Sequence, residues 1–474
     1  MSSIFPLHQL PRSRTIARLT PIVVAVAATL AAPIARADEA ALKAEIAELR
    51  AQVEQMKAQI RELATQSRPA AAPTTGAQSA APSTPVAATP AATPPAASAS
   101  QSADLAARVE RLEQSANAQA EEQSATSLFG YGEITYSRPR NDASQTQADL
   151  ARAVLGWSHR FDARTRMAAE LEVEHAVASS DDKGEVEIEQ FYAERQFGDT
   201  VGGRAGLFII PIGLLNEHHE PTQYYGVFRN AVETSIIPTT WREGGFAVYG
   251  RTELGLEWNV GLTTGFNLAK WDATSGEGRD SPLGSIHQEL SQASARNLSQ
   301  YVSLAYVGLP GWTFGGTYFT GKAGQGTPDF AAPDARVTLW EAHARWQPGP
   351  FDIAALYARG TISDTEALNL TFVGLPTPVP ERFYGGYVQA AWRGAWQYKD
   401  YSLTPFTRVE WVNTAAAYAP VPEGLGVAPS PTERIWTIGA DLYVTPGIVF
   451  KTDYQRFRND SSRDAFQVGF GLNF

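Results

Sequence analysis

The 474-residue sequence contains no cysteine, which excludes disulfides, thiol catalysis and cysteine-ligated zinc, haem or iron–sulfur centres. Basic residues are also scarce: 39 Lys and Arg stand against 50 Asp and Glu, and the net charge of −11 argues against a nucleic-acid partner. Aromatic residues are absent from residues 38–126, so this region cannot build an ordinary globular core. All 11 Trp and 17 Tyr lie after position 127, and two segments of different chemistry therefore share the chain.

Residues 1–37 have the composition of a signal peptide for export. Basic residues precede an apolar run over 19–30, and residues 35–37 supply a small-x-small cleavage site. A membrane anchor is the alternative, but the run is shorter than the ~20 apolar residues that a spanning helix needs. Removing this segment takes away four arginines, lowers the net charge from −11 to −15 and places the mature chain outside the cytoplasm.

Residues 38–64 predict a coiled coil, because their apolar residues recur at the four- and three-residue spacings of a heptad. This pattern favours a parallel dimer, and a helix packed within the same chain is the alternative. Residues 65–103 contain 14 Ala and 7 Pro, which predicts a disordered Ala/Pro-rich linker, and a short helix is expected over 104–126. The heptad positions are Leu42, Ile46, Leu49, Val53, Met56, Ile60 and Leu63.

Residues 127–474 alternate apolar and polar side chains with a period of two, the pattern of a strand with lipid on one side and water on the other. Short turns, such as Gly250-Arg251, follow the even-numbered segments, and mostly long connections follow the odd-numbered ones. This regular alternation predicts a sixteen-stranded antiparallel transmembrane β-barrel with its tight turns and its N-terminal coiled coil in the periplasm. The strands are expected to begin near 128, 150, 165, 187, 203, 244, 252, 298, 312, 335, 350, 383, 403, 433, 447 and 464.

One expected strand breaks the alternation. Val186 and Ile188 lie on one parity, whereas Phe191 and Ala193 lie on the other. A β-bulge, or a later start of the strand, is therefore expected near residue 190.

A barrel in lipid has to close, because hydrocarbon offers no partner to unpaired backbone groups. Sixteen strands leave a lumen wide enough for water. We therefore expect a diffusion channel for small hydrophilic solutes in the outer membrane of a Gram-negative bacterium. The alternative is a structural protein whose coiled coil tethers that membrane to the cell wall or to a periplasmic partner.

The third long connection, from Gly213 to Glu243, is too rich in aromatic and apolar residues to be a freely solvated loop. We expect it to fold into the lumen and to narrow the channel. Its charged side chains, and two adjacent histidines that can titrate, are candidates for the pore constriction. These candidates are Glu217, His218, His219, Glu220, Arg229, Arg242 and Glu243.

Two runs within residues 188–250, Phe-Tyr-Ala-Glu-Arg-Gln-Phe and Arg-Ala-Gly-Leu-Phe-Ile-Ile-Pro-Ile-Gly-Leu-Leu-Asn-Glu, resemble the phosphate-selective porin O and P family. The resemblance implies trimeric sixteen-stranded pores with an inward-folded third loop, and an arginine ladder with a lysine cluster that attracts phosphate. The terminal Phe474 resembles the signature that the barrel-assembly machinery recognises. The implied partners are outer-membrane lipid, this machinery, further copies of the chain and small hydrophilic solutes.

The sequence departs from that family where selectivity would lie. Residues 127–474 contain only five Lys, and 28 basic residues stand against 39 acidic ones. A dianion in a low-dielectric constriction needs fixed positive charge, for which Arg195 and Arg204 are candidates on the lumen wall. The row Glu170, Glu172 and Glu174 would instead favour cations, and the sequence leaves both possibilities open.

Other chemistry finds little support. Glu217-His218-His219-Glu220 contains metal-ligand residue types, but adjacent histidines diverge in an extended loop, and no metal site is predicted. The remaining histidines lie in no recognisable nucleophile–base motif. We therefore predict no enzymatic activity and no cofactor.

Overall fold

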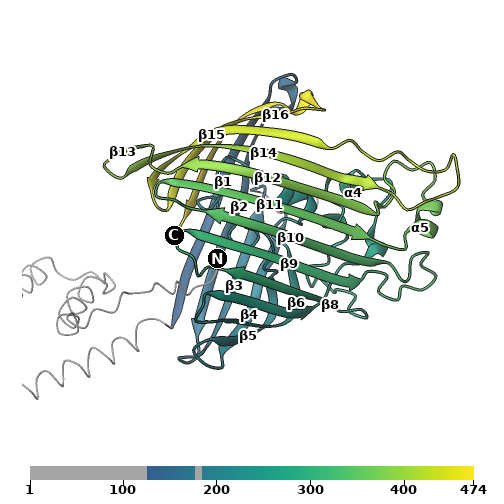
Figure 1. The fold of residues 1–474 in the computed structure, drawn as a ribbon, viewed down its shortest axis with the longest axis horizontal. Coiled ribbons are helices and arrows are strands. Elements are labelled where there is room, and N and C mark those ends of the chain that lie inside the picture. The colour runs from purple at the N-terminus through teal and green to yellow at the C-terminus, as the bar shows by residue number, and fades with distance from the viewer. Residues whose placement is uncertain (1–124, 177–183) are drawn as a thin grey trace, which may run out of the picture. The chain divides into compact units, whose positions relative to one another are not determined.

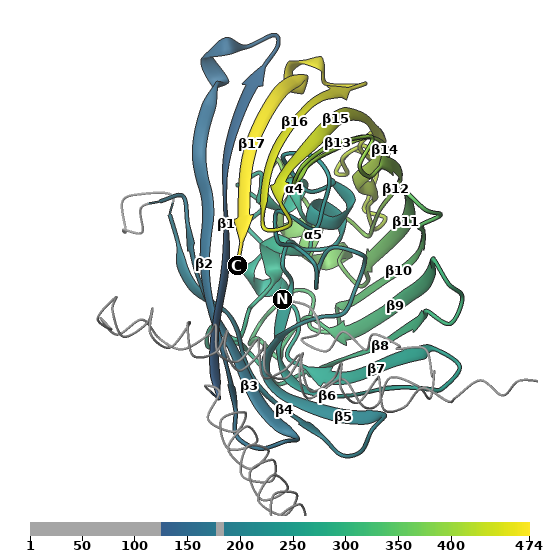
Figure 2. The same cartoon turned by 90° about the vertical axis from the view of Figure 1, so that its left-hand side faces the viewer.

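A closed β-barrel accounts for most of the described chain, which in the computed structural model comprises residues 125–176 and 184–474. Seventeen strands form one antiparallel sheet, and pairing of the first strand with the last closes it into a ring (Figures 1 and 2). The strands are β1 (Thr126–Pro139), β2 (Gln147–Arg160), β3 (Thr165–Glu174), β4 (Val186–Gln196), β5 (Val201–Ile209), β6 (Arg242–Arg251), β7 (Leu256–Thr263), β8 (Ser299–Tyr306), β9 (Trp312–Lys322), β10 (Arg336–Trp346), β11 (Phe351–Ile362), β12 (Arg382–Trp392), β13 (Trp396–Tyr398), β14 (Tyr401–Ala417), β15 (Glu433–Thr445), β16 (Ile448–Phe457) and β17 (Ala465–Asn473).

Sixteen of these strands form the barrel wall. The three-residue strand β13 pairs only with β14, and β12 pairs directly with β14, so β13 is a short hairpin arm outside the ring. The prediction of a sixteen-stranded antiparallel barrel is therefore confirmed.

Side chains on the two faces of the wall differ as the period of two requires. Along β7, Leu256, Val260 and Leu262 point outward and are exposed, whereas Gly261 and Thr263 are buried on the inner face. The outer face is thus a band of apolar and aromatic residues, as a surface in contact with lipid should be.

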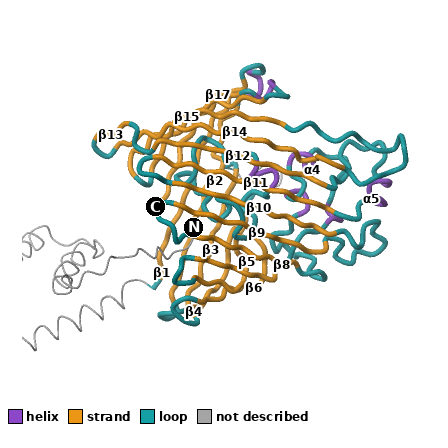
Figure 3. The backbone as a smooth tube through the Cα atoms, in the orientation of Figure 1, coloured by secondary structure: helices purple, strands orange, loops and turns teal. Residues whose placement is uncertain are grey.

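Connections at the two ends of the barrel differ in length, and the long ones gather at one end (Figure 3). One predicted turn is misplaced: Gly250-Arg251 still pairs within β6, and the turn comprises residues 252–255, where Gly255 takes a positive φ of 84°. Glycine suits this turn because it alone adopts such a backbone without a steric penalty. The long connections carry short helical segments, namely η1 (Ala143–Gln145), η2 (Val232–Ile236), η3 (Leu268–Lys270), α4 (Glu277–Asp280), η4 (Gly284–Ile286), α5 (Glu366–Thr371) and η5 (Ser461–Arg463).

The predicted bulge is present in β4. Ile188 pairs with Leu171 and Gln190 pairs with Glu170, so Glu189 is the extra residue between two consecutive pairs. Both Glu189 and Gln190 are consequently buried on the inner side, and the bulge adds a carboxylate to the lumen wall.

The barrel closes at its C-terminus. The Phe474 amide donates to the Gly130 carbonyl at 2.9 Å, and the Gly130 amide donates to the Phe474 carbonyl at 3.1 Å. The signal peptide, the coiled coil, the linker and nearly all of the short helix predicted over 104–126 lie outside the described residues. Within residues 125–176 and 184–474, no helix combines the length and the apolarity that a membrane span requires.

Candidate functional site: the lumen and its third loop

The segment 210–241, which joins β5 to β6, lies inside the barrel. Most of its residues are buried, and its contacts reach inward-facing side chains of β4 and β12, which lie on opposite sides of the wall. At its end, Trp241 is fully buried against Phe266 and Phe319, with ring centroids 5.0 and 4.6 Å away. The aromatic and apolar side chains of this loop are thus buried in the lumen, away from water.

Asn216 joins the two ends of this loop. Its side-chain amide donates to the carbonyls of Ile210 and Trp241 at 2.8 and 3.0 Å, and its oxygen accepts from the Trp241 amide at 2.8 Å. The loop therefore leaves and re-enters the wall at one fixed place.

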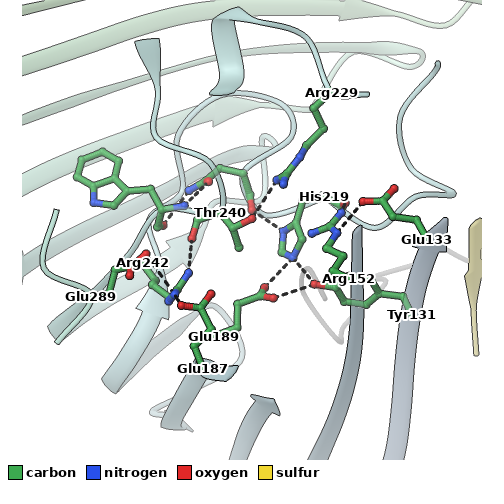
Figure 4. A network of polar contacts seen from close by, with 12 residues as sticks. Tyr131, Glu133, Arg152, Glu187, Glu189, His219, Arg229, Thr240, Arg242 and Glu289 are labelled. Atoms are coloured by element: carbon green, nitrogen blue, oxygen red, sulfur yellow. Dashed lines mark hydrogen bonds and ion pairs between the residues drawn. The ribbon is translucent and has the colours of Figure 1, made fainter. Parts of the chain in front are cut away.

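His219 anchors the loop to the wall of β1 and β4 (Figure 4). Its Nε2 lies 2.7 Å from Glu189 Oε1, and both side chains are completely buried. The Tyr131 hydroxyl donates to the other Glu189 oxygen at 2.9 Å and lies 2.8 Å from His219 Nε2. The extra carboxylate of the bulge is thus the partner of the loop histidine.

Both nitrogens of the His219 ring are engaged. Its Nδ1 lies 2.8 Å from the Asn216 carbonyl, which only accepts, so Nδ1 is the donor of this hydrogen bond. Its Nε2 faces the Tyr131 hydroxyl and the Glu189 carboxylate. The ring is therefore fixed in position by partners on both of its polar edges.

Arg152 on β2 makes a second anchor beside the first (Figure 4). Its guanidinium donates to the His219 carbonyl at 2.5 Å and to Glu133 at 2.8 Å. The other Glu133 oxygen accepts from the hydroxyl of the loop residue Tyr224 at 2.5 Å. Charge-assisted bonds of this kind are stronger than neutral ones, so this side of the loop is firmly held.

Further round the wall, on β14 to β16, carboxylates accept hydrogen bonds from the loop backbone. The amides of Gly226, Val227 and Ala231 donate to carboxylates of β15, β16 and β14 at 3.3, 2.7 and 2.7 Å. These carboxylates belong to Asp441, Asp453 and Glu410, respectively. Two wall cations bind loop carbonyls in return: Lys451 reaches Tyr224 at 2.8 Å, and Arg408 reaches Tyr225 at 3.2 Å.

Glu233 organises the inner turn of the loop. Its carboxylate accepts from the Leu214 and Leu215 amides at 2.8 and 2.7 Å, and from the Tyr387 hydroxyl of β12 at 2.7 Å. Burial raises the pKa of this carboxyl above its ordinary value, although these hydrogen bonds act in the opposite direction.

The constriction candidates divide between the loop and the wall. Glu217, His218, His219, Glu220 and Arg229 lie in the loop, where His218 is exposed and His219 and Glu220 are buried. Arg229 donates to the Thr240 hydroxyl at 2.9 Å.

Arg242 and Glu243 belong to β6 and not to the loop, because their residues already pair with β5. The Arg242 guanidinium forms ion pairs with Glu187 and Glu289, and the Glu243 carboxylate accepts from Trp241 and Thr264. Both side chains are buried where the loop rejoins the wall.

The lumen-wall candidates also divide. Glu170 and Glu172 are buried on the inner face, and Glu174 is half-buried near the end of β3. Arg204 points inward, where it contacts Glu194 at 3.2 Å and lies over the Tyr192 ring at 4.4 Å.

Arg195 does not belong to the lumen. It follows the bulge on the outward parity of Phe191 and Ala193, and its exposed guanidinium pairs with Asp162 of a short turn at 3.2 Å. The bulge recognised in the sequence already implied this reversal of faces.

Sequence reasoning missed most of the residues that hold the loop. Parity alone would have placed Tyr131, Glu133 and Arg152 on the inner face, but no local signal shows that they bind a loop. Asp441 and Asp453 lie more than 200 positions from their loop partners, which only the closed ring brings together.

Among residues 125–176 and 184–474, Glu170, Glu189 and His219 could hold a metal, since one ligand atom from each lies within 4.8 Å of the others. The His219 ring, however, is engaged at both nitrogens by Asn216 and Glu189. A metal ligand needs a free nitrogen lone pair, so this arrangement suits a proton better than a metal ion.

The fold resembles that of outer-membrane porins. OmpF of Salmonella typhi, solved as a complex with daunomycin, matches with a TM-score of 0.51 and 14% identity, over 74% of this chain and 97% of that one. The chain therefore has the fold of an outer-membrane porin.

Two further similarities accompany this match. An anion-selective porin from Comamonas acidovorans gives a TM-score of 0.46 and 10% identity, over 74% of this chain and 99% of that one. In sequence, the chain is 28% identical to an uncharacterized protein of Aquifex aeolicus (strain VF5), over 72% of this chain and 78% of the relative. No known family model matches the sequence.

Proposed function

We propose that this protein is a diffusion channel for small hydrophilic solutes across the outer membrane. The observation that carries the proposal is the segment 210–241, which crosses a sixteen-stranded barrel and is bonded to strands β4 and β12 on opposite sides of it. A loop held in this way narrows a wide lumen to a polar passage that excludes large solutes by size and sorts small ones by charge.

The charges along this passage favour cations. The loop contributes Glu217, Glu220 and Glu233 against one guanidinium, that of Arg229. The arginines of the inner wall are largely neutralised by carboxylates within ion-pair distance. These pairs are Arg152–Glu133, Arg204–Glu194, Arg242–Glu289, Arg345–Asp352 and Arg408–Glu410.

Phosphate, which the family resemblance implies, is the competing solute class. A phosphate site would need several cations free to face one anion. Arg229 alone among the constriction candidates is an arginine bonded to a hydroxyl and not to a carboxylate. We therefore propose a passage that prefers cations to phosphate.

The test is the reversal potential of the purified full chain in planar bilayers under a KCl gradient. The expected sign is that of K⁺ preferred to Cl⁻, and Arg229→Gln should move the potential further in that direction. Arg393→Gln, an exposed arginine after β12 on the short-turn end, is the matched control and should leave the potential unchanged. A Cl⁻ preference would overturn the proposed selectivity, and the absence of any conductance would overturn the channel itself.

We also propose a homo-oligomer, which the family resemblance implies is a trimer. The support is that resemblance together with the heptad spacing of residues 38–64. Mass measurement of the detergent complex tests it, and a monomeric mass would contradict it.

A further inference from the structure

On one side of the described barrel wall, six arginines lie on the outer face near the ends of strands that lead into the long connections. They come from one side of the wall, β10 to β12 and β15 to β16, and we call them the arginine band. Five are exposed and Arg359 is half-buried, on the same outward parity as Trp340, Tyr357 and Trp436. The band consists of Arg336, Arg359, Arg382, Arg434, Arg456 and Arg458.

The band brings like charges together. Arg434 and Arg458 are direct neighbours across β15 and β16, since the Arg458 amide donates to the Arg434 carbonyl at 3.0 Å. Arg456 is opposite Trp436, one pair further along the same two strands. Like charges directly opposite each other destabilise a sheet, so the arrangement needs a compensating anion.

The protein itself supplies no such anion. Along the described strands β10, β11, β12, β14, β15 and β16, no Asp or Glu lies on the outward parity. The carboxylate of Glu433, next to Arg434 in the sequence, accepts from the backbone amides of Arg434, Arg458 and Asn459, each at 2.9 Å. This carboxylate is therefore hydrogen-bonded to backbone amides. Within the described residues, no ion pair joins an arginine of the band to an Asp or Glu.

A groove of about 530 Å³ leads away from the two neighbouring arginines. Arg434, Arg458, Thr432 and Asn459 line one end, and aromatic residues line the other. Its depth depends on a glycine: a Cβ at Gly386 would come within 3.2 Å of the Tyr357 ring. The aromatic lining consists of Tyr357, Tyr384 and Trp411.

We propose that the arginine band and this groove bind a phosphorylated glycolipid of the outer leaflet, with phosphate groups against the arginines and an acyl chain in the groove. The long connections mark the extracellular end of the barrel, so the band lies at the depth of the outer-leaflet headgroups. Guanidinium groups suit phosphate because they donate two parallel hydrogen bonds. The proposal rests on the outer-membrane location of the barrel, and it does not depend on the conductance or the selectivity of the lumen.

A second copy of the chain is a poorer occupant of the same surface. It would have to bring a cluster of carboxylates to an outer face, and the described outward positions of the strands from β10 to β16 carry none. A free inorganic anion would neutralise the arginines but would leave the aromatic groove unfilled. The amphipathic pairing of charge and groove therefore points to a lipid.

The first test uses the unaltered full chain. Native mass spectrometry in detergent should show adducts with added bisphosphorylated lipid A and adducts at least about tenfold weaker with the same lipid lacking both phosphates. Inorganic phosphate at equal concentration should not displace the lipid. Equal binding of both lipids, or displacement by inorganic phosphate, would overturn the proposal.

The second test compares two triple variants. R434Q/R456Q/R458Q should lose lipid A binding by about tenfold or more. R160Q/R164Q/R393Q removes three exposed arginines from the short-turn end and should bind like the parent. Heat-modifiable migration on gels verifies that both variants are folded. The proposal would be overturned if the first variant bound lipid A as the parent does. It would also be overturned if the first variant lost its oligomeric state while its lipid A binding persisted.

Discussion

Glu189→Gln is the sharpest perturbation of the loop anchor. The substitution keeps the shape of the side chain but removes the carboxylate charge that faces Nε2 of the buried His219 ring at 2.7 Å. Because both side chains are fully buried, solvent does not screen the pair, and a charge left without its partner is costly.

The expected size of the effect follows from this burial. Breaking a buried ion pair by removing one partner costs about 3 kcal/mol or more. At about 1.4 kcal/mol per factor of ten, the population of loops released from this wall should rise roughly a hundredfold. The anchors at Asp441, Asp453 and Glu410 stay intact, so the loop should swing about these contacts and not leave the barrel.

Two measurements follow the release. Single-channel records of Glu189→Gln should show added open-channel noise or conductance substates, and amide exchange over 216–224 should accelerate relative to the rest of the loop. Glu194→Gln is the matched control, since it removes a buried carboxylate from the same strand whose ion-pair partners, Arg166 and Arg204, lie on the wall. If the two variants behave alike, the anchoring role of Glu189 is refuted.

Other perturbations probe the loop, the fold and the tail. Replacing 216–236 by a Gly-Ser linker should raise the conductance and weaken K⁺ preference in bilayer recordings, because it widens the passage and removes Glu217, Glu220 and Glu233; unchanged conductance would contradict this. Burial raises the pKa of Glu233 in the folded state above its pKa in the unfolded state. The contribution of this carboxyl to the free energy of unfolding is therefore greatest below the unfolded-state pKa and falls as pH rises through the folded-state pKa. Glu233→Gln should flatten the dependence of urea stability on pH across that window, and a steeper dependence would count against this role. Phe474→Ala should lower the yield of assembled barrel in cells while purified barrels keep their conductance, since the side chain is 69% exposed; normal yield would speak against an assembly signal. Deleting 38–123 should leave conductance intact while abolishing any attachment to cell-wall or periplasmic partners in pull-downs, and lost conductance would make the tail part of the pore.

The barrel could be predicted because lipid and water act on alternate residues. The strands predicted near 165, 312 and 433 begin at Thr165, Trp312 and Glu433, since a period of two survives every local variation in residue type. The strand expected near 252 begins later, at Leu256, because its first residues form a turn around Gly255. Boundaries of this kind depend on backbone conformation, which hydrophobic period does not report.

The bulge shows how far such reasoning extends. A break in parity at Phe191 identified it, but its consequence for Arg195, which moves to the outer face, follows only when the register is carried past the extra residue. The contact between the extra residue, Glu189, and the loop residue His219 depends on the three-dimensional path of residues 210–241. Parity in the sequence does not report this path.

The loop's partners on β14 to β16 could not be predicted from the sequence for a different reason. Asp453 meets the Val227 amide because ring closure brings β16 beside a loop that leaves from β5. Sequence separation carries no information about such a contact, although the abundance of inward carboxylates indicates that something polar must face them.

Single-channel recording of the purified full chain in planar bilayers tests the central claim most directly, that a loop-narrowed lumen conducts. Such a lumen should give discrete ohmic steps that small polyethylene glycols reduce and larger ones do not, as a passage of fixed width requires. A folded, correctly inserted barrel that passes no current in either polarity would contradict it.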